Sequence, residues 1–296
     1  MNNATRLGFV GLGVMGEPMC RNMTKAGLGS MIVFDLNPDP VERLQELGAQ
    51  KAGSLADVAQ NADIVFLSLP GGPEVEKIVL GSDGLMANGH AGQIIVDMST
   101  CPVSIARSAA VQLENKNMMF VDAPVARTRQ AAEDGTLSIM VGGDEETYRR
   151  IHPILRATAT DITHCGGVGA GQAVKLLNNM LLIQSVVALA EAFTIADRCG
   201  VTREVLADAL SKGSADSFAL RNHGRKAMLP GIFPVGAFAT NYAHKDISYA
   251  LELAAECGVR SPAGELAKSL LERTNEAGYG QEYFPVLMKI IEGSRQ

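Results

Sequence analysis

A lysine and two amide side chains are spaced so that one face of a helix would carry all of them. Within the apolar run 173–182, Lys175 is followed by Asn178, Asn179 and Leu182, and helix positions i, i+3, i+4 and i+7 lie on the same side. Desolvation by apolar neighbours lowers the pKa of a lysine amine, which suits the group to proton transfer near neutral pH. The same strip would also be compatible with a solvent-facing surface, and helical geometry alone does not separate the two interpretations.

A second group of residues is spaced to bind a dinucleotide. Gly11, Gly13 and Gly16 follow an apolar run and open a helical segment. Such glycines permit a tight turn, a close approach of the backbone to a pyrophosphate and close helix–strand packing. The N-terminus of the helix would direct free N–H groups and its positive dipole end at the phosphates. Asp35 ends the next apolar run, where its carboxylate can accept hydrogen bonds from ribose hydroxyls.

This acidic residue also bears on the choice of cofactor. Asp35 would repel a 2′-phosphate, and neither Leu36 nor Asn37 offers a cation to hold one. NAD is therefore predicted in preference to NADP, although Arg43 is close enough in sequence to reach back toward the ribose.

Two further polar stretches follow apolar runs abruptly, Asp97–Thr100 and Asp122–Val125. Loops at the carboxyl ends of parallel strands line the ligand crevice in sheets of this kind. Ser99 and Thr100 are therefore candidate ligand contacts, and they also suit the N-cap of a helix that begins near Pro102.

These residues need a scaffold, and the chain up to about residue 165 alternates short β-rich runs with helical segments. Continuous apolar strands that alternate with helices indicate a parallel sheet covered on both faces. The predicted strands are 7–10, 31–34, 64–67, 94–97, 119–121 and 138–141, and the helices predicted between the early strands are 16–26, 40–47 and 73–79.

After the glycine-rich stretch 165–171 the pattern becomes helical. A long helix is predicted over about 170–198 with Gly200 as its C-cap, and shorter helices over 203–210, 241–257 and 262–277. The fold class is therefore an α/β Rossmann domain with a mostly parallel, doubly wound sheet over 1–165, followed by an all-helical substrate and oligomerisation domain over 166–296. Lys175 would begin the polar strip just past the hinge, where an interdomain cleft is expected.

Bulk composition narrows the class of protein. A chain of 296 residues with 47% hydrophobic and 20% charged residues is typical of a soluble enzyme of about two domains. The net charge of −6 and the lack of a basic stripe argue against a nucleic-acid partner. Five scattered cysteines without ligand spacing indicate free thiols in a reducing cytosol and no metal site. The longest apolar run, 180–190, is too short for a bilayer, so a cytoplasmic protein with no membrane partner is predicted.

Taken together and in this order, the motifs resemble those of the β-hydroxyacid dehydrogenases along essentially the whole chain. The resemblance rests on five segments, Gly8–Gly16, Asp122–Val125, Gly135–Gly143, Gly169–Asn179 and His244–Asp246. It implies an NAD-dependent enzyme that interconverts a small anionic 3-hydroxy acid and its semialdehyde by hydride transfer.

The resemblance further implies roles for individual residues. Lys175 would be the catalytic acid/base, and Lys245 would lie beside the nicotinamide end of the cofactor. The residues expected to contact the substrate are Ser99, Arg127, Thr128, Asn178, Asn179 and Leu182. The residues expected to contact the cofactor are Gly11, Gly13, Val14, Met15, Gly16, Asp35, Leu69, Thr100 and Lys245.

One departure from the family pattern concerns the substrate. Most members continue Asp-Ala-Pro-Val with Ser-Gly-Gly, whose backbone and hydroxyl hold the substrate carboxylate. This chain has Ala126, Arg127 and Thr128 instead, which looks like the 3-sulfolactaldehyde reductase branch, where the arginine holds a sulfonate. A guanidinium offers a fork of donors to such an anion. Arg127 is therefore predicted to clamp the substrate anion, unless it pairs on the surface with Glu133 or Asp134.

Several functions remain open at this point. 3-Sulfolactaldehyde is the leading substrate, and 3-hydroxyisobutyrate, tartronate semialdehyde, 4-hydroxybutyrate and a 3-hydroxy amino acid are alternatives. A non-catalytic NAD(H)-sensing protein is an alternative of another class, disfavoured by the intact Lys175 and Asn179. A 6-phosphogluconate dehydrogenase would need a larger helical domain and several cations for a phosphate. The long, largely apolar helix indicates a homodimer or homotetramer.

Overall fold

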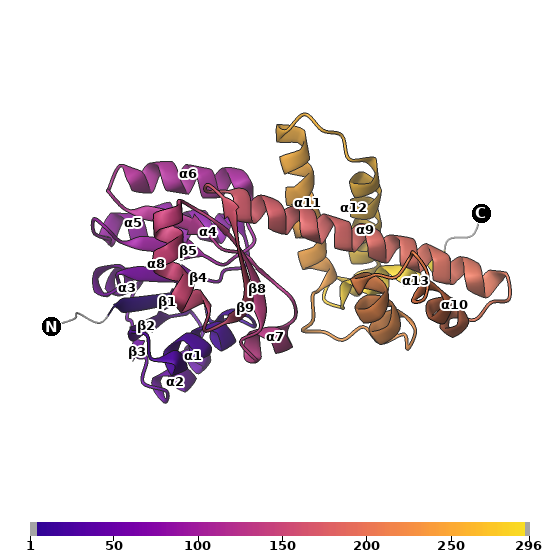
Figure 1. The fold of residues 1–296 in the computed structure, drawn as a ribbon, viewed down its shortest axis with the longest axis horizontal. Coiled ribbons are helices and arrows are strands. Elements are labelled where there is room, and N and C mark those ends of the chain that lie inside the picture. Colours follow the sequence, from indigo (N-terminus) through magenta and orange to yellow (C-terminus); the bar gives the residue numbers. More distant parts are fainter. Residues whose placement is uncertain (1–4, 294–296) are drawn as a thin grey trace. The chain divides into compact units, whose positions relative to one another are not determined.

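The structure is a computed structural model that describes residues 5–293 (Figure 1). The chain divides into two compact units, Met1–Lys175 and Leu176–Gln296. The predicted boundary at 165/166 lies ten residues earlier, because the first residues of the long helix are hydrogen-bonded to the strands of the first unit.

The first unit is built on one sheet. In the described residues its strand order is β3-β2-β1-β4-β5-β6-β8-β7, with β9 paired to β8, and the part 3-2-1-4-5-6 is the order of dinucleotide-binding sheets. Strands β1 to β6 are parallel, whereas β8 runs antiparallel to β6 and β7. The bounds are β1 Arg6–Val10, β2 Ser30–Phe34, β3 Gln50–Lys51, β4 Ile64–Leu67, β5 Ile94–Asp97, β6 Met119–Asp122, β7 Val125–Ala126, β8 Leu137–Gly142 and β9 Ala159–Gly166.

Helices cover both faces of this sheet, which confirms the predicted doubly wound fold. Alternation along β1 shows why, since Leu7 and Phe9 join one buried cluster and Val10 joins the other. The first cluster contains residues of α1 Gly16–Ala26, α2 Pro38–Gln45, α7 Arg129–Glu133 and α8 Glu145–Leu155. The second contains residues of α3 Leu55–Asn61, α4 Gly72–Leu80, α5 Leu85–Asn88 and α6 Val103–Glu114.

All six predicted strands are present within about one residue of the predicted bounds, and three short or polar strands were missed. β3 and β7 have two residues each, and β9 is largely polar and only partly buried. β7 continues the line of β6, since Asp122 pairs with Gly142 and Ala126 pairs with Ser138 of the same antiparallel partner. Such strands carry no alternation of apolar residues, so the pattern did not reveal them.

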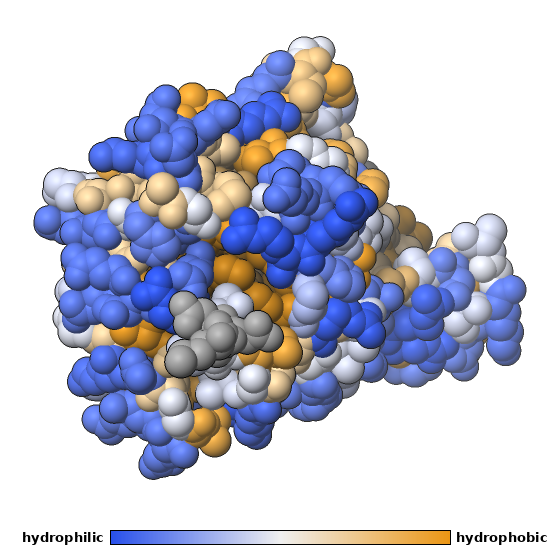
Figure 2. Space-filling view, turned by 60° about the vertical axis from the view of Figure 1, so that its left-hand side comes forward, coloured by the Kyte–Doolittle hydropathy of each residue, from blue (hydrophilic) through white to orange (hydrophobic). Residues whose placement is uncertain are grey.

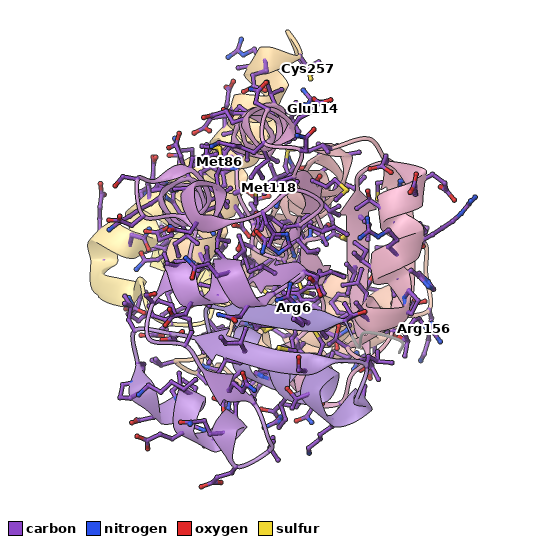
Figure 3. All side chains as sticks on the ribbon, turned by 90° about the vertical axis from the view of Figure 1, so that its left-hand side faces the viewer. Arg6, Met86, Glu114, Met118, Arg156 and Cys257 are labelled. Carbon is purple, nitrogen blue, oxygen red and sulfur yellow. The ribbon has the colours of Figure 1, made fainter. Side chains whose placement is uncertain are left out.

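The sheet has a distinct amino edge and carboxyl edge. Figure 3 views the structure from the side at which β1 begins, and it labels Arg6, Glu114 at the end of α6 and Met118 just before β6. Arg6 is tied to Asp63 by an ion pair of 2.6 Å at this edge. The glycine loop and the segments after β4, β5 and β6 lie at the carboxyl edge. Figure 2 shows a face on which hydrophilic residues predominate, with small hydrophobic patches among them.

The second unit is helical in its described residues, as predicted. Its core gathers apolar side chains from the long helix α9 and from the helices after it. The elements are α9 Ala170–Arg198, α10 Arg203–Leu210, a π-helix at Ala219–Met228, α11 Thr240–Glu256, α12 Pro262–Thr274, a π-turn at Asn275–Tyr279, a 3₁₀ turn at Phe284–Leu287 and α13 Met288–Gly293. The helix predicted over 262–277 is α-helical to Thr274 and continues as the π-turn, which contains Gly278 at a left-handed φ of 90°.

Helix α9 bears on the expectation that the chain has no membrane span. By length and composition, its 29 residues would suffice to cross a bilayer, although the run 180–190 alone would not. Half of the apolar window is buried inside the structure, and Ile183, Val186 and Phe193 belong to the core of the second unit. A core helix passes the same length test, so this single helix is weak support for a membrane span.

Candidate cofactor and catalytic site

The three glycines of the loop between β1 and α1 meet the requirements of a dinucleotide turn. Gly11 has a φ of +91°, and a Cβ there would lie 2.3 Å from the carbonyl oxygen of Ser68. At Gly16 a Cβ would lie 2.0 Å from the carbonyl oxygen of Gly11, so only glycine permits this packing. Gly13 is exposed, and a Cβ there would have no atom within 4 Å. The loop thus leaves open space over the middle glycine, where a pyrophosphate would approach the backbone.

Asp35 lies directly beside this loop. Its carboxylate accepts hydrogen bonds from the N–H groups of Leu12 at 2.5 Å and Asn37 at 2.7 Å, which hold it at the carboxyl end of β2. The first turn of α1 has no side-chain cap, and its Glu17 and Met19 N–H groups donate to the carbonyls of Gly13 and Met15. An anion would therefore meet the N–H groups of the loop that leads into the helix. Val14 is 53% exposed and Met15 is half-buried. These residues fit the ribose and pyrophosphate of a dinucleotide.

Arg43, which is close enough in sequence to reach back toward the ribose, forms an ion pair with Glu17. Its Nε and Nη2 donate to the two carboxylate oxygens of Glu17 at 2.6 and 2.8 Å, and this bidentate contact lowers the pKa of the Glu17 carboxyl. Glu17 follows the last glycine of the loop, so α1 holds the arginine of α2 in a fixed position.

The segments after β4 and β5 are joined at the same edge. The hydroxyl of Ser99 accepts a hydrogen bond from Leu69 N–H at 2.8 Å, and Ser99 N–H donates to Asp97 at 2.9 Å. Leu69 lies beside the glycine loop, since a Cβ on Gly11 would meet its Cδ2 at 3.0 Å. Ser99 is buried and Thr100 is half-buried. Both predicted groove residues, Leu69 and Thr100, therefore lie on segments at the carboxyl edge.

Lys175 stands on α9, and the start of that helix is bound to β6. The buried carboxylate of Asp122 accepts hydrogen bonds from Gly169 N–H at 2.6 Å and Gln172 N–H at 2.7 Å. Burial raises the pKa of the Asp122 carboxyl to about 6, against the backbone N–H bonds, which lower it. Lys175 lies three residues after Gln172 and is only 9% exposed. The solvent-facing interpretation of this lysine is therefore not what the structure shows.

In the second unit, Asn179 is buried and held by an acidic partner. Its Nδ2 donates to Asp246 at 2.7 Å, and its Oδ1 accepts a hydrogen bond from Asn178 at 3.1 Å. Lys245 lies 3.4 Å from the same aspartate and between the rings of Tyr242 and Tyr249, at 5.5 and 5.6 Å from their centroids. Leu182 packs against the core.

Arg127 occupies an unusual position. Its φ is +88°, a left-handed backbone that favours glycine, at the place where the family pattern has glycine. The guanidinium donates to Thr160 Oγ1 at 2.8 Å, to Asp161 at 2.6 Å and to the carbonyl of Thr136. The alternative of a surface ion pair with Glu133 or Asp134 is not what the structure shows: Arg127 pairs with Asp161, and Glu133 pairs with Arg129. Thr128 caps α7 through its hydroxyl.

Three residues of this arrangement were missed as site residues. All three residues, Asp122, Gln172 and Asp246, lie inside the motifs quoted above, but their partners lie about 50 to 70 residues away. A buried carboxylate after an apolar strand was the available signal for Asp122. Among residues 5–293, no three His, Cys, Asp or Glu side chains are grouped to hold a metal ion.

Comparison with known proteins identifies the family of the chain. Residues 6–167 match the family model described as the NAD binding domain of 6-phosphogluconate dehydrogenase, and residues 169–291 match that described as the NAD-binding of NADP-dependent 3-hydroxyisobutyrate dehydrogenase. The chain is 38% identical to 2-(hydroxymethyl)glutarate dehydrogenase of Eubacterium barkeri, covering 99% of this chain and 96% of that protein. It is 34% identical to NAD-dependent L-serine dehydrogenase of Pseudomonas aeruginosa, covering 97% and 98%.

A solved structure is also similar over the whole chain. It is Mycobacterium tuberculosis 3-hydroxyisobutyrate dehydrogenase with L-serine, with a TM-score of 0.90 and 30% identity over 98% of this chain and 99% of that one. The fold, the glycine loop and the named relatives together define a nicotinamide-dependent oxidoreductase that acts on a CH–OH group. More closely, the chain belongs to the β-hydroxyacid dehydrogenases related to 3-hydroxyisobutyrate dehydrogenase.

Proposed function

We propose that this enzyme interconverts a small anionic 3-hydroxy acid and its semialdehyde, with Lys175 as the acid/base. The observation that carries the proposal is the buried lysine on a helix anchored to the carboxyl edge of the sheet, the edge that also holds the glycine loop. A bound nicotinamide supplies the acceptor for the hydride of the carbinol carbon. The Lys175 amine takes the hydroxyl proton as the alcohol is oxidised and returns it to the carbonyl oxygen in the reduction.

The amide of Asn179 is proposed to orient the substrate beside the lysine. The two residues are four positions apart in α9, so they share one side of the helix. Asp246 fixes the Nδ2 of Asn179 and thereby sets which way its carbonyl oxygen points. We assign Asn178 and Leu182 to the same surface and Lys245 to the nicotinamide end of the cofactor, as the resemblance implies.

The substrates named for similar proteins narrow the class. 3-Hydroxyisobutyrate, L-serine and 2-(hydroxymethyl)glutarate all carry a primary alcohol on the carbon β to a carboxylate. They differ in the substituent at C2, which is a methyl, an amino or a carboxyethyl group. We infer that this enzyme also acts on a 2-substituted 3-hydroxypropanoate, since the reacting end is common to all three.

Arg127 supports a second candidate, the reduction of 3-sulfolactaldehyde. An arginine at a left-handed position is tolerated here although glycine would be less strained, which is a reason to look for a use of its guanidinium. The Arg127 guanidinium now donates to Thr160 and Asp161. To hold a sulfonate, it would have to share its N–H donors between the substrate anion and Asp161.

NAD is proposed as the preferred cofactor. Asp35 would repel a 2′-phosphate, and Glu17 engages Arg43, the cation of α2 within reach of the ribose. A cytoplasmic homodimer or homotetramer remains our expectation for the assembly.

A turnover panel tests the function. The purified enzyme is assayed with NAD⁺ and NADP⁺ against 3-hydroxyisobutyrate, L-serine, 2-(hydroxymethyl)glutarate, 4-hydroxybutyrate and 2,3-dihydroxypropanesulfonate, and in reverse with tartronate semialdehyde. Turnover of a 3-hydroxy carboxylate supports the main proposal, and a strong preference for the sulfonate supports the second. NADH binding without turnover of any compound would instead indicate a sensing protein.

A further inference from the structure

We propose that Asp122 is a positioning residue for catalysis, because its carboxylate fixes the first turn of α9 and hence the position of Lys175. The inference rests on the proposed role of Lys175 as the acid/base. In this proposal Asp122, the first residue of the Asp122–Val125 motif, holds the helix and does not contact the substrate.

The first argument is the geometry of the carboxylate. Each oxygen accepts one backbone N–H, from Gly169 at 2.6 Å and from Gln172 at 2.7 Å. The first N–H groups of a helix have no intrahelical acceptor, and a negative charge at this end is favourable to the helix dipole. Asp122 therefore acts as an N-terminal cap that comes from another element, 47 to 50 residues earlier in the chain.

The second argument is that two glycines leave the space that this contact needs. A Cβ at Gly142 would lie 2.5 Å from Asp122 Oδ1, and a Cβ at Gly171 would lie 2.8 Å from Oδ2. The Cβ at Gly171 would also lie 2.4 Å from the carbonyl oxygen of Met140. Any other residue at Gly142 or Gly171 would push the carboxylate or the helix away, so both glycines permit the close approach of α9 to β6 and β8.

The third argument is a second tie on the same turn. The Nε2 of Gln172 donates to the carbonyl of Ser99 at 2.8 Å, and its Oε1 accepts a hydrogen bond from Cys101 N–H at 3.2 Å. The turn is thus held by the ends of both β5 and β6, and Lys175 follows within one turn. A misplacement of about 1 Å in a reacting group can reduce a rate by roughly a hundredfold, so this anchoring has a direct consequence for proton transfer.

The chain provides a matched control in Asp144. Its carboxylate caps α8, accepting hydrogen bonds from Thr147 N–H at 2.8 Å and from Thr147 Oγ1 at 2.6 Å. Both aspartates lie in the first unit and cap a helix, but α8 carries none of the proposed site residues. Asp144 is exposed and Asp122 is fully buried, so a role confined to stability predicts a larger loss of stability in Asp122→Asn with the kcat of the folded enzyme unchanged. A positioning role predicts that the kcat of the folded enzyme falls.

The experiment compares Asp122→Asn and Asp144→Asn in the full-length enzyme at pH 7.5. The asparagine at 122 must turn its NH₂ toward one of the two N–H donors, so one hydrogen bond is lost. We expect hydrogen exchange in residues 169–176 to accelerate about tenfold or more, since about 1.4 kcal/mol corresponds to a factor of ten. The kcat for the hydroxy acid should fall at least tenfold, with a smaller change in KM and an unchanged Kd for NADH. Asp144→Asn should alter none of these.

A spectroscopic readout reports on the lysine without any substrate. The enzyme is reductively methylated with ¹³C-formaldehyde, and the Lys175 signal is assigned by its loss in Lys175→Arg. We expect the shift of this signal to change in Asp122→Asn and to stay constant in Asp144→Asn.

The outcomes separate this inference from the proposed function. An unchanged Lys175 signal and unchanged exchange in Asp122→Asn would overturn the positioning role, whatever the turnover. If the wild type turns over no hydroxy acid, the proposed function fails, yet exchange and the lysine signal still decide whether Asp122 holds the helix. Should Asp122→Asn not fold, Asp122→Ser, whose smaller hydroxyl can accept one N–H, takes its place in the same comparison.

Discussion

The guanidinium of Arg43 in α2 makes a bidentate ion pair with the carboxylate of Glu17 in α1, with N···O distances of 2.6 and 2.8 Å. Glu17 follows directly on the glycine loop, and α2 begins three residues after Asp35. The pair therefore joins the two elements that would surround the adenosine ribose. While it is intact, the cation nearest to a 2′-phosphate on α2 is occupied by protein.

Removing this pair should relax the preference for NAD. In Glu17→Gln, Arg43 loses its charged partner and becomes available to a 2′-phosphate, so we expect kcat/KM for NADP⁺ to rise several-fold while that for NAD⁺ changes less. Glu42→Gln, which removes an exposed carboxylate one residue from Arg43, serves as the control and should leave the ratio unchanged. Equal ratios in all three proteins would show that Glu17 has no part in cofactor choice.

Loss of the lysine amine should stop the chemistry but not the binding of the nucleotide. We expect Lys175→Ala to lower kcat by about a thousandfold or more, in line with removal of a general acid/base, while the Kd for NADH measured by fluorescence stays within about twofold. Lys175→Arg keeps the charge but cannot release a proton near neutral pH, and it should be equally inactive. Turnover near the wild-type rate in either variant would refute the proposed mechanism.

The contact between Asn179 and Asp246 is expected to affect substrate orientation. Asp246→Asn replaces the charged acceptor of the Asn179 amide with a neutral amide that can also present its NH₂, and we expect kcat/KM for the hydroxy acid to fall about tenfold or more with NADH binding little changed. Asp197→Asn, which breaks an ion pair with Arg203 elsewhere in the second unit, is the matched control. Steady-state kinetics of the two variants make the comparison, and equal effects would argue for a purely structural contact.

The proposed anion contact of Arg127 is best tested with glycine, because alanine at a φ of +88° would retain the backbone strain. If the guanidinium holds the substrate anion, Arg127→Gly should raise KM for that substrate at least tenfold. Arg129→Ala, which removes the neighbouring arginine paired with Glu133, should leave KM unchanged. If instead Arg127 only pairs with Asp161, KM stays constant and the loss of this exposed pair changes stability little, because solvent screens it.

The buried carboxyl of Asp122 predicts a pH dependence of stability with a definite sign. Burial raises its pKa to about 6 in the folded protein from an ordinary value near 3.8, with a smaller contribution from the charge of Asp97. A raised pKa means that the native state binds the proton more tightly. The group's contribution is therefore fully present below pH 3.8 and is lost as the pH rises through about 6.

Urea unfolding of the wild type and Asp122→Asn at pH 4.5, 6 and 7.5 measures this effect. The free-energy advantage of the wild type over the asparagine variant should be larger at pH 4.5 than at pH 7.5, by about 2 kcal/mol for a shift of about two pKa units, because part of the linked free energy develops only below pH 4.5. A constant difference across this range would mean that Asp122 titrates at its ordinary value.

The sequence by itself determined the cofactor-binding scaffold. The glycine loop is a local device, since a positive φ at Gly11 and the close approach of Gly16 to Gly11 depend on residues only a few positions apart. Apolar strands alternating with amphipathic helices likewise predict a doubly wound sheet, because a short strand whose residues are all apolar must be buried on both of its faces. Lys175 and Asn179 could be paired from sequence for the same reason, as helical periodicity is local.

Only the tertiary structure decided what those residues contact. Asp122 meets Gln172, Glu17 meets Arg43, Arg127 meets Asp161, and Asn179 meets Asp246, across separations of 26 to 67 residues. In the unfolded chain, a carboxylate can approach many basic groups and N–H donors. Tertiary packing decides which of them becomes its partner. The physical reason is that hydrogen bonds and ion pairs act over about 3 Å, whereas the pattern of a sequence specifies burial and periodicity but not which distant elements come within that range.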